Sequence, residues 1–325
     1  MPVSMSKAMA PASIGNVAVG FDILGQAFPV AFDAVTARRR AETGVALGAV
    51  SGLMTALPEE PDRNTALRAG RMVLDLAGDP FGAVLDIEKG VPMSSGMGGS
   101  AASAVAGAVA VNALLPQPLP MEVLLRCAFE GERASADPPP VDNVAASLYG
   151  GLVLLSDDDP LRVVPIPAPR GLVCILVHPD IRIETRMARG VLKDTVALKT
   201  AIDHSRHLAV FIAGCYQNDA ALLKLGLRDV MIEPQRRHLL PVLDAAQGAV
   251  REAGAIGCSI SGAGPSIFAW AEEARAGAVE AALTGALTAA GLSHRVYTAP
   301  VDGPGAQVVP ADSAETREAS GDAPA

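Results

Sequence analysis

The segment over residues 90–115 constrains the fold of this chain more than any other feature. It begins with a Gly/Ser-rich loop, GVPMSSGMGG, and continues with an apolar run, SAASAVAGAVAVNALL. Alternation over residues 83–88 predicts a strand before the loop, and the apolar run predicts a helix after it. A helix that is apolar on every side has to be buried between layers of structure. The rest of the chain must therefore cover this helix.

The length of the chain favours two domains. It has 325 residues, of which 50% are hydrophobic and 19% charged, and this is more than one compact core usually holds. We predict an N-terminal domain over residues 1–160 and a C-terminal domain over residues 161–302, separated at an acidic turn, DDDP. Residues 303–325 are rich in Gly, Pro and Ala without periodicity, which predicts a disordered tail.

Charge and hydropathy exclude two classes of partner. The 26 Lys and Arg against 35 Asp and Glu give a net charge of −9, so we expect no nucleic acid partner. The longest apolar run, over residues 101–115, is Ala-rich and interrupted by polar residues and Gly. It is too short and too weakly apolar to span a bilayer, so we expect no membrane association.

The cysteines and the first ten residues predict a cytoplasmic protein. The four cysteines form no CxxC pair and show no zinc-ligand spacing, which is typical of reduced thiols. Residues 1–10 lack the basic-then-apolar order of a signal peptide.

The glycine loop has the chemistry of a phosphate site. Glycines let backbone amides approach an anion, and the unpaired N–H groups of a helix N-terminus favour negative charge. The loop lacks the Gly-Lys-Ser/Thr of a P-loop and the spacing of a dinucleotide fingerprint. A tight connection without a ligand is the alternative interpretation.

Two further segments accompany this loop: PASIGNVAVGFD over residues 11–22 and GCSISGAGPS over residues 257–266. The three segments, in this order, resemble the three motifs of the GHMP small-molecule kinases, and most closely those of the homoserine kinases. The resemblance covers roughly residues 8–300. It implies an α+β, two-domain GHMP kinase fold, with an N-terminal ribosomal-protein-S5-like domain and a C-terminal ferredoxin-like domain. It also implies ATP-dependent phosphorylation of the L-homoserine hydroxyl, a step of threonine biosynthesis.

The resemblance implies an ATP site in the glycine loop, with Mg²⁺ as cofactor. Ser100 matches the serine that helps to hold the metal and the phosphates, and Glu132 matches a metal-binding glutamate; Mg²⁺ prefers such hard oxygen donors. For Asn64 the alternative interpretation is a helix cap. The implied ATP-binding residues are Asn64, Pro92, Met93, Ser94, Ser95, Gly96, Met97, Gly98, Gly99, Ser100, Ala101 and Ala102.

The resemblance also implies an amino-acid site. Asn143 would hold the attacking hydroxyl and Asp142 would shape the pocket, with Asp142 as a base the minority interpretation, because phosphoryl transfer needs mainly alignment and charge. A pair of arginines forks onto a carboxylate as lysine cannot, and an Asp suits the ammonium group. The implied substrate-binding residues are Asn16, Asp22, Asn143, Thr185, Arg189, Arg236 and Gly262.

One departure from the family pattern leaves the acceptor open. Pro140 stands where homoserine kinases carry a histidine before Asp142 and Asn143. A kinase for another small alcohol or amino alcohol is therefore an alternative, as is a regulatory pseudokinase, although Ser100 and Glu132 are both present. The third motif is expected to pack against the nucleotide loop without taking part in the chemistry. The family also implies a possible homodimer.

Overall fold

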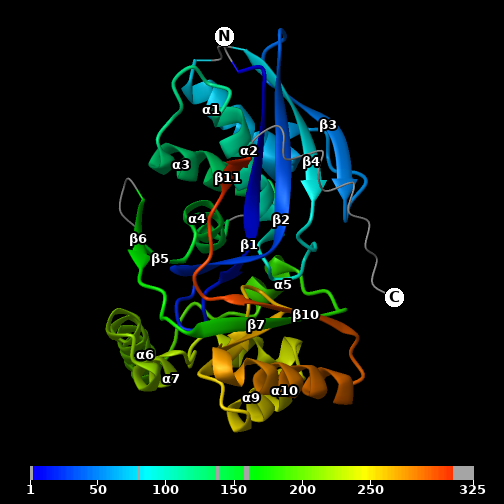
Figure 1. The fold of residues 1–325 in the computed structure, drawn as a ribbon. Coiled ribbons are helices and arrows are strands. Elements are labelled where there is room, and N and C mark those ends of the chain that lie inside the picture. Colours follow the sequence, from blue (N-terminus) through cyan, green and yellow to red (C-terminus); the bar gives the residue numbers. More distant parts are fainter. Residues whose placement is uncertain (1–2, 79–80, 137–138, 157–160, 310–325) are drawn as a thin grey trace.

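The computed structural model describes residues 3–78, 81–136, 139–156 and 161–309, and these form two lobes around two sheets (Figure 1). The first sheet has seven strands and runs β11-β1-β2-β4-β3, with β5 paired to β2 and β6 to β5. Only the β3–β4 pair is parallel among these. Its strands are β1 (Met5–Gly15), β2 (Leu24–Arg40), β3 (Val45–Gly52), β4 (Gly82–Lys89), β5 (Leu152–Ser156), β6 (Arg162–Ile166) and β11 (Gln307–Val309).

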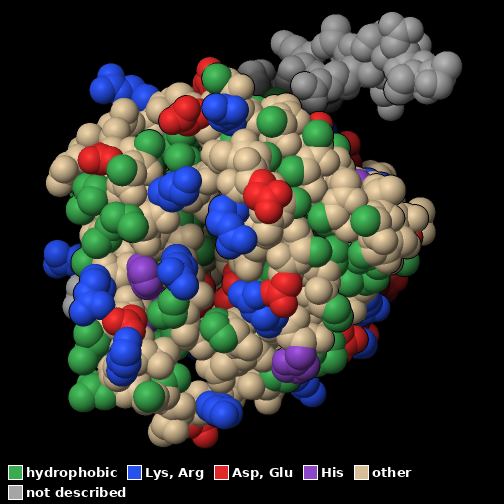
Figure 2. All heavy atoms as spheres, turned by 90° about the horizontal axis from the view of Figure 1, so that it is seen from below, with side chains coloured by type: hydrophobic (Ala, Val, Ile, Leu, Met, Phe, Trp, Pro, Cys, Tyr) green, Lys and Arg blue, Asp and Glu red, His purple; other side chains and the backbone are tan. Residues whose placement is uncertain are grey.

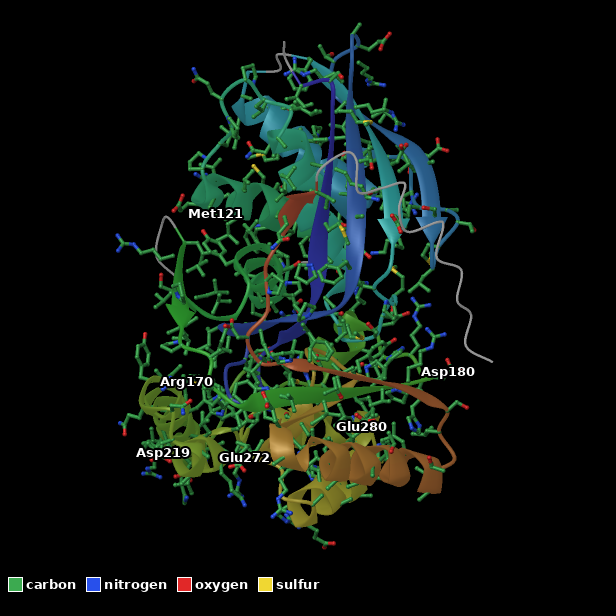
Figure 3. The ribbon with its side chains drawn as sticks, viewed as in Figure 1. Met121, Arg170, Asp180, Asp219, Glu272 and Glu280 are labelled. Atoms are coloured by element: carbon green, nitrogen blue, oxygen red, sulfur yellow. The ribbon has the colours of Figure 1, made fainter. Side chains whose placement is uncertain are left out.

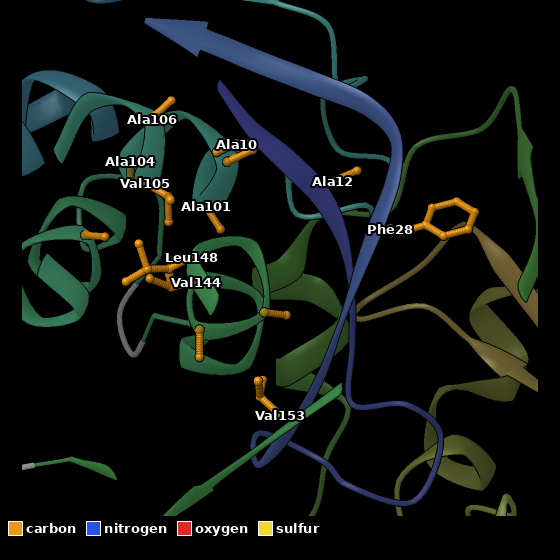
Figure 4. Packing of buried hydrophobic residues seen from close by; sticks show 14 of the residues in the cluster. Ala10, Ala12, Phe28, Ala101, Ala104, Val105, Ala106, Val144, Leu148 and Val153 are labelled. Carbon is orange, nitrogen blue, oxygen red and sulfur yellow. The ribbon is translucent and has the colours of Figure 1, made fainter. Parts of the chain in front are cut away.

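Four helices cover one face of this sheet: α1 (Thr65–Leu76), α2 (Gly99–Asn112), α3 (Met121–Glu132) and α4 (Val141–Tyr149). Helix α2 packs against β1 and β2 and against the other three helices. All of its residues except Ser100 and Val109 are buried, which confirms the expected buried helix. Figure 4 shows the small side chains of α2 beside Val144 and Leu148 of α4. Ala at most contact positions lets the backbones of these elements approach closely.

The second lobe is built on an antiparallel sheet of order β10-β7-β9-β8. Helices α9 and α10 pack on this sheet, and α6 and α7 pack on each other beside it (Figure 1). Asp219 caps α7 by accepting from Ala221 N and Leu222 N (Figure 3). The elements are β7 (Leu172–Pro179), α5 (Thr185–Gly190), α6 (Leu198–Gln217), α7 (Ala220–Gly226), α8 (Glu233–Arg236), α9 (Leu243–Glu252), β8 (Gly257–Ile260), β9 (Ile267–Glu272), α10 (Ala276–Ala289) and β10 (His294–Pro300). Short 3-10 helices lie at Pro61–Arg63, Arg237–Leu239 and Glu273–Arg275.

The two lobes are tied together by buried polar contacts. Trp270 Nε1 on β9 donates to Gln26 Oε1 on β2 at 3.0 Å.

On the face seen from below, Lys and Arg side chains lie among Asp and Glu side chains (Figure 2). None of the described helices has both the length and the apolar content needed to cross a bilayer.

The structure changes two of the expected boundaries. Strand β6 pairs with β5, so the first sheet continues past residue 160 to Ile166; the acidic turn at residues 157–160 lies outside the described residues. Residues 303–309 were expected to begin a disordered tail, yet β11 pairs with β1. The edge of β1 provides backbone hydrogen-bond partners for residues 307–309, and these partners cannot be inferred from the composition of the segment. Residues 310–325 lie outside the described part.

Candidate active site

The glycine loop joins β4 to α2, as the sequence predicts. Gly98 immediately precedes α2 and has a φ of 66°, in the left-handed region that favours glycine. A Cβ at this position would overlap the Ser13 hydroxyl and lie 3.0 Å from Asn143 Oδ1. The backbone N–H groups at the start of α2 have no intrahelical acceptors, and the helix dipole adds positive potential there. This end of α2 is therefore suited to an anion.

Both other glycine-containing motifs contact this loop. Ser13 N donates to Met97 O at 3.0 Å, and Ser261 Oγ donates to Gly96 O at 2.6 Å. A Cβ on Gly96 would lie 2.6 Å from the Ser261 carbonyl oxygen, so no larger residue fits there without a shift. The loop is thus held between β1 and the second lobe, which confirms the packing role expected for the third motif.

Ser100 and Glu132 come together from α2 and α3. Ser100 Oγ donates to Glu132 Oε1 at 2.5 Å. Glu132 is only 1% exposed, and its Oε2 has no hydrogen-bond partner within the described part of the chain. Burial raises the pKa of Glu132 to about 7. A partnerless carboxylate oxygen beside a hydroxyl fits a hard divalent cation such as Mg²⁺.

Asp142 and Asn143 lie in the first turn of α4, against the first motif. Asp142 Oδ2 accepts from Asn16 N at 2.7 Å, and Asn143 Oδ1 accepts from Ser13 Oγ at 2.9 Å. Burial, together with the nearby Asp22 carboxylate, raises the pKa of Asp142 to about 6. These bonds hold both side chains next to the end of α2.

Arg189 on α5 forms a two-pronged ion pair with Asp22. Its Nη1 donates to Asp22 Oδ2 at 2.9 Å and its Nη2 donates to Oδ1 at 2.8 Å. The resemblance places a substrate carboxylate at Arg189 and a substrate ammonium at Asp22. In this structure the Arg189 guanidinium and the Asp22 carboxylate instead pair with each other.

Arg236 is a buried cation without a matching anion. It is 4% exposed, and its Nε and Nη1 donate to Ala188 O at 3.0 Å and Gly262 O at 3.1 Å. Its guanidinium lies 5.1 Å from the centre of the Phe21 ring. Among the described residues, no carboxylate lies within ion-pair distance of it. Burial and the neighbouring Arg189 lower the pKa of Arg236, so an added carboxylate would be favoured here.

The side chains of Ser100, Glu132, Asp142, Asn143, Arg189 and Arg236 line one cleft that is open to solvent. Its walls come from the segment between β1 and β2, the glycine loop, α3, α4, α5, α8 and the third motif. The lining residues are Asn16, Phe21, Asp22, residues 93–96, residues 98–101, Glu132, Ser135, Ala136, Pro140, Asp142, Asn143, Ile183, Thr185, Arg189, Arg236 and residues 262–264.

Comparison with known proteins agrees with this geometry. The family model for the GHMP kinases N terminal domain matches residues 64–151, and the model for the GHMP kinases C terminal matches residues 211–288. The homoserine kinase of Xylella fastidiosa (strain 9a5c) is 46% identical over 312 residues, which cover 94% of each chain. This chain belongs to the GHMP kinase family.

Other members of the family support the same assignment. The homoserine kinase of Xanthomonas campestris pv. campestris (strain B100) is 42% identical over 305 residues, 94% of each chain. The crystal structure of homoserine kinase from Cytophaga hutchinsonii superposes with a TM-score of 0.90 at 36% identity, covering 94% of this chain and 98% of that one. The mevalonate kinase of L. major shares the fold, with a TM-score of 0.67 at 19% identity, covering 92% and 98%. The two-domain GHMP kinase fold is therefore confirmed.

The cleft brings together most of the residues singled out from the sequence. All seven of the implied substrate-binding residues line it, as do Ser100, Glu132 and Asp142. From the implied ATP-binding set, the cleft includes Met93, Ser94, Ser95, Gly96, Gly98, Gly99, Ser100 and Ala101.

Four of the implied ATP-binding residues do not line the cleft. Asn64 caps α1: its Oδ1 accepts from Ala66 N at 3.1 Å and Leu67 N at 3.3 Å, and its Nδ2 donates to a carbonyl. Asn64 therefore does form the helix cap of the alternative interpretation, and an adenine contact by this residue stays a prediction. The other three are Pro92, Met97 and Ala102, of which Met97 and Ala102 are fully buried.

Sequence reasoning did not identify Phe21 as part of this GHMP kinase site. Its ring lies 5.6 Å from the Arg189 guanidinium and 5.1 Å from that of Arg236. Cations over an aromatic face are stabilised by the ring, so Phe21 holds the two arginines on one side of the cleft. The place of Phe21 directly before Asp22 in the first motif was the available signal.

The ionisation of Glu132 leads to a prediction for stability. Because burial raises its pKa from 4.5 to about 7, the folded protein binds a proton there more tightly than the unfolded chain. The free energy of unfolding therefore falls as pH rises through this range, by roughly 3 kcal/mol in total. In metal-free buffer we expect Glu132→Gln to unfold at a higher temperature than the unchanged protein at about pH 8. The difference in unfolding temperature between the two proteins should shrink towards about pH 5. A difference that does not depend on pH would contradict this prediction.

Proposed function

We propose that this chain is a homoserine kinase that transfers the γ-phosphoryl group of ATP to the hydroxyl of L-homoserine. The product is O-phospho-L-homoserine, an intermediate of threonine biosynthesis. The observation that carries the proposal is a single cleft with an anion-binding helix end on one side and a buried, unpaired arginine with an Asp–Arg pair on the other. The kinase names of the relatives agree with it.

The glycine loop would bind the ATP phosphates through its backbone amides. The positive potential of the N-terminus of α2 stabilises the charge that develops on the transferred group. Mg²⁺, when bound, neutralises phosphate charge and orients the phosphates. Ser100 and Glu132 would hold it, since Glu132 Oε2 is buried without a partner and both side chains offer oxygen ligands.

The amino acid would enter by exchanging partners with an existing ion pair. Asp22 and Arg189 neutralise each other in the described structure. A zwitterion offers an ammonium group for Asp22 and a carboxylate that Arg189 and Arg236 would share, so each charged group then has a neighbour of opposite charge. A neutral alcohol would leave the buried Arg236 without an anion, which is unfavourable.

The acceptor hydroxyl would then lie near Asn143 and Asp142. Asn143, held by Ser13, can accept or donate a hydrogen bond to orient the hydroxyl. Alignment of this kind supplies much of the rate enhancement in phosphoryl transfer. Asp142 remains bonded to Asn16 N, which supports an electrostatic and positioning role rather than proton abstraction.

A second candidate is a kinase for another small alcohol or amino alcohol. It is favoured by Pro140, which lines the cleft just before Asp142 and offers no donor where homoserine kinases carry a histidine. A homodimer and a cytoplasmic location remain predictions from the family and from the cysteine spacing.

An ADP-release assay over several acceptors tests these functions. With MgATP we expect the highest kcat/KM for L-homoserine, and at least about 100-fold less for L-serine, L-threonine, mevalonate or galactose, because these carry the hydroxyl at a different position or lack the ammonium group. Fastest turnover of another alcohol would support the second candidate. Tight ATP binding without any turnover would support a pseudokinase and overturn both.

A further inference from the structure

A buried ion pair lies directly behind the glycine loop, outside the cleft. Lys89 ends β4 and Asp33 lies on the neighbouring β2; they are 2% and 0% exposed and in direct contact. Lys89 Nζ also donates to Gly99 O at 2.9 Å and to Ser103 Oγ at 2.8 Å. A lysine ammonium has three N–H groups, and here each has an acceptor. Lys89 is therefore not available to bind a phosphate.

The partners of this pair lie at the two ends of the loop. Asp33 Oδ1 accepts from Gly90 N and Val91 N, both at 3.0 Å, where the loop begins. Lys89 bonds to Gly99 O, where the loop ends and α2 begins. Ser103, one turn further along α2, donates to Asp33 Oδ2 at 2.6 Å. The start and the end of the loop are thus joined through one carboxylate and one ammonium.

Stability alone does not account for such a pair. Replacing a buried ion pair by apolar side chains of similar size is often neutral or stabilising, because desolvation offsets the attraction between the charges. A buried ion pair can instead act by imposing a single geometry on the groups around it. The part of the molecule that this pair fixes is the loop that lines the cleft.

We propose that Asp33, Lys89 and Ser103 form a loop clamp that presets the backbone amides of residues 93–98 for the phosphates of a nucleotide. Lys89 is a positioning residue in this clamp, acting through the loop rather than on the ligand. The proposal rests on the proposed function for the identity of the ligand. The clamp itself can be tested without turnover.

Two variants separate positioning from folding. Lys89→Met removes the link between the loop ends but leaves Asp33 buried and unpaired. Asp33→Asn/Lys89→Met restores neutrality at similar size and keeps an acceptor for Gly90 N, yet still lacks the link. We expect both to weaken ATP binding in calorimetry by about tenfold or more, with binding of L-homoserine changed less than about twofold. Amides of residues 90–98 should exchange with D₂O about tenfold faster, while those of α3 are unchanged.

The control and the contrary outcomes are defined by the same measurements. Lys7→Met removes a partly buried lysine that pairs with Glu88, next to Lys89 in β4, and should change neither readout. Wild-type ATP affinity in a double variant of restored thermal stability would overturn the proposal, as would weaker ATP binding with unchanged loop exchange. If Lys89→Met does not fold, Ser103→Ala should still speed loop exchange. If the unchanged protein binds no ATP, the proposed function fails while the exchange measurement still decides on the clamp.

Discussion

We expect Glu132→Gln to lower kcat by about 10³-fold with saturating ATP, Mg²⁺ and L-homoserine. The substitution replaces the Glu132 carboxylate, which accepts from Ser100 Oγ, by an uncharged amide. The buried Oε2 of Glu132 has no hydrogen-bond partner among the described residues and is the oxygen that fits the cation. Losing about 4 kcal/mol of transition-state stabilisation corresponds to this factor. Steady-state kinetics over a range of Mg²⁺ concentrations measure it, and excess Mg²⁺ should not restore the rate.

Glu122→Gln is the matched control, because Glu122 lies on the same helix, α3, but is exposed. It should retain kcat within about twofold. A Glu132→Gln protein that folds normally and keeps its full rate would remove Glu132 from the metal site and leave Ser100 without the carboxylate that the proposal needs.

For Arg236→Ala we expect the KM for L-homoserine to rise about 100-fold while kcat and the KM for ATP change by less than about threefold. The guanidinium is buried beside the cleft without a carboxylate partner among the described residues. A charge-assisted, forked contact with the substrate carboxylate is therefore its strongest available interaction. The rise corresponds to about 2.7 kcal/mol of lost binding.

Two further variants test the geometry of this contact. Arg236→Lys keeps the charge but loses the fork, so its KM should lie between those of the unchanged protein and Arg236→Ala. Arg251→Ala removes an exposed arginine from α9 and should have no effect. If Arg236→Ala lowers kcat and leaves KM unchanged, Arg236 acts on the transferred phosphoryl group and the proposed carboxylate site is wrong.

Local patterns predicted the glycine loop and the buried helix α2 correctly. The glycines of the loop and the apolar residues on all sides of α2 are features of short stretches of sequence, so they can be recognised without knowing the fold. Helix α4, by contrast, was not predicted, although Asp142 lies in its first turn. It has nine residues and no side-chain cap, and it is stabilised by packing against β1, β2 and α2.

The same limit applies to the end of the chain. Strand β11 has three residues in a segment rich in Gly, Pro and Ala, and its own sequence favours a loop. It forms because the edge of β1 presents unpaired backbone groups at that place. Asn64 shows the reverse case, since its role as a helix cap could be predicted from local capping chemistry alone.

By itself the sequence determined that a glycine-rich loop precedes a buried helix, and which segments line the cleft, because backbone freedom and apolar periodicity are short-range properties. Only the tertiary structure decided how the charges of the site are distributed. Arg189 neutralises Asp22, 167 residues away in the chain, while Arg236 is left buried without a carboxylate. Coulomb energy depends on distance and burial, and both are set by the packing of the two lobes rather than by residue type.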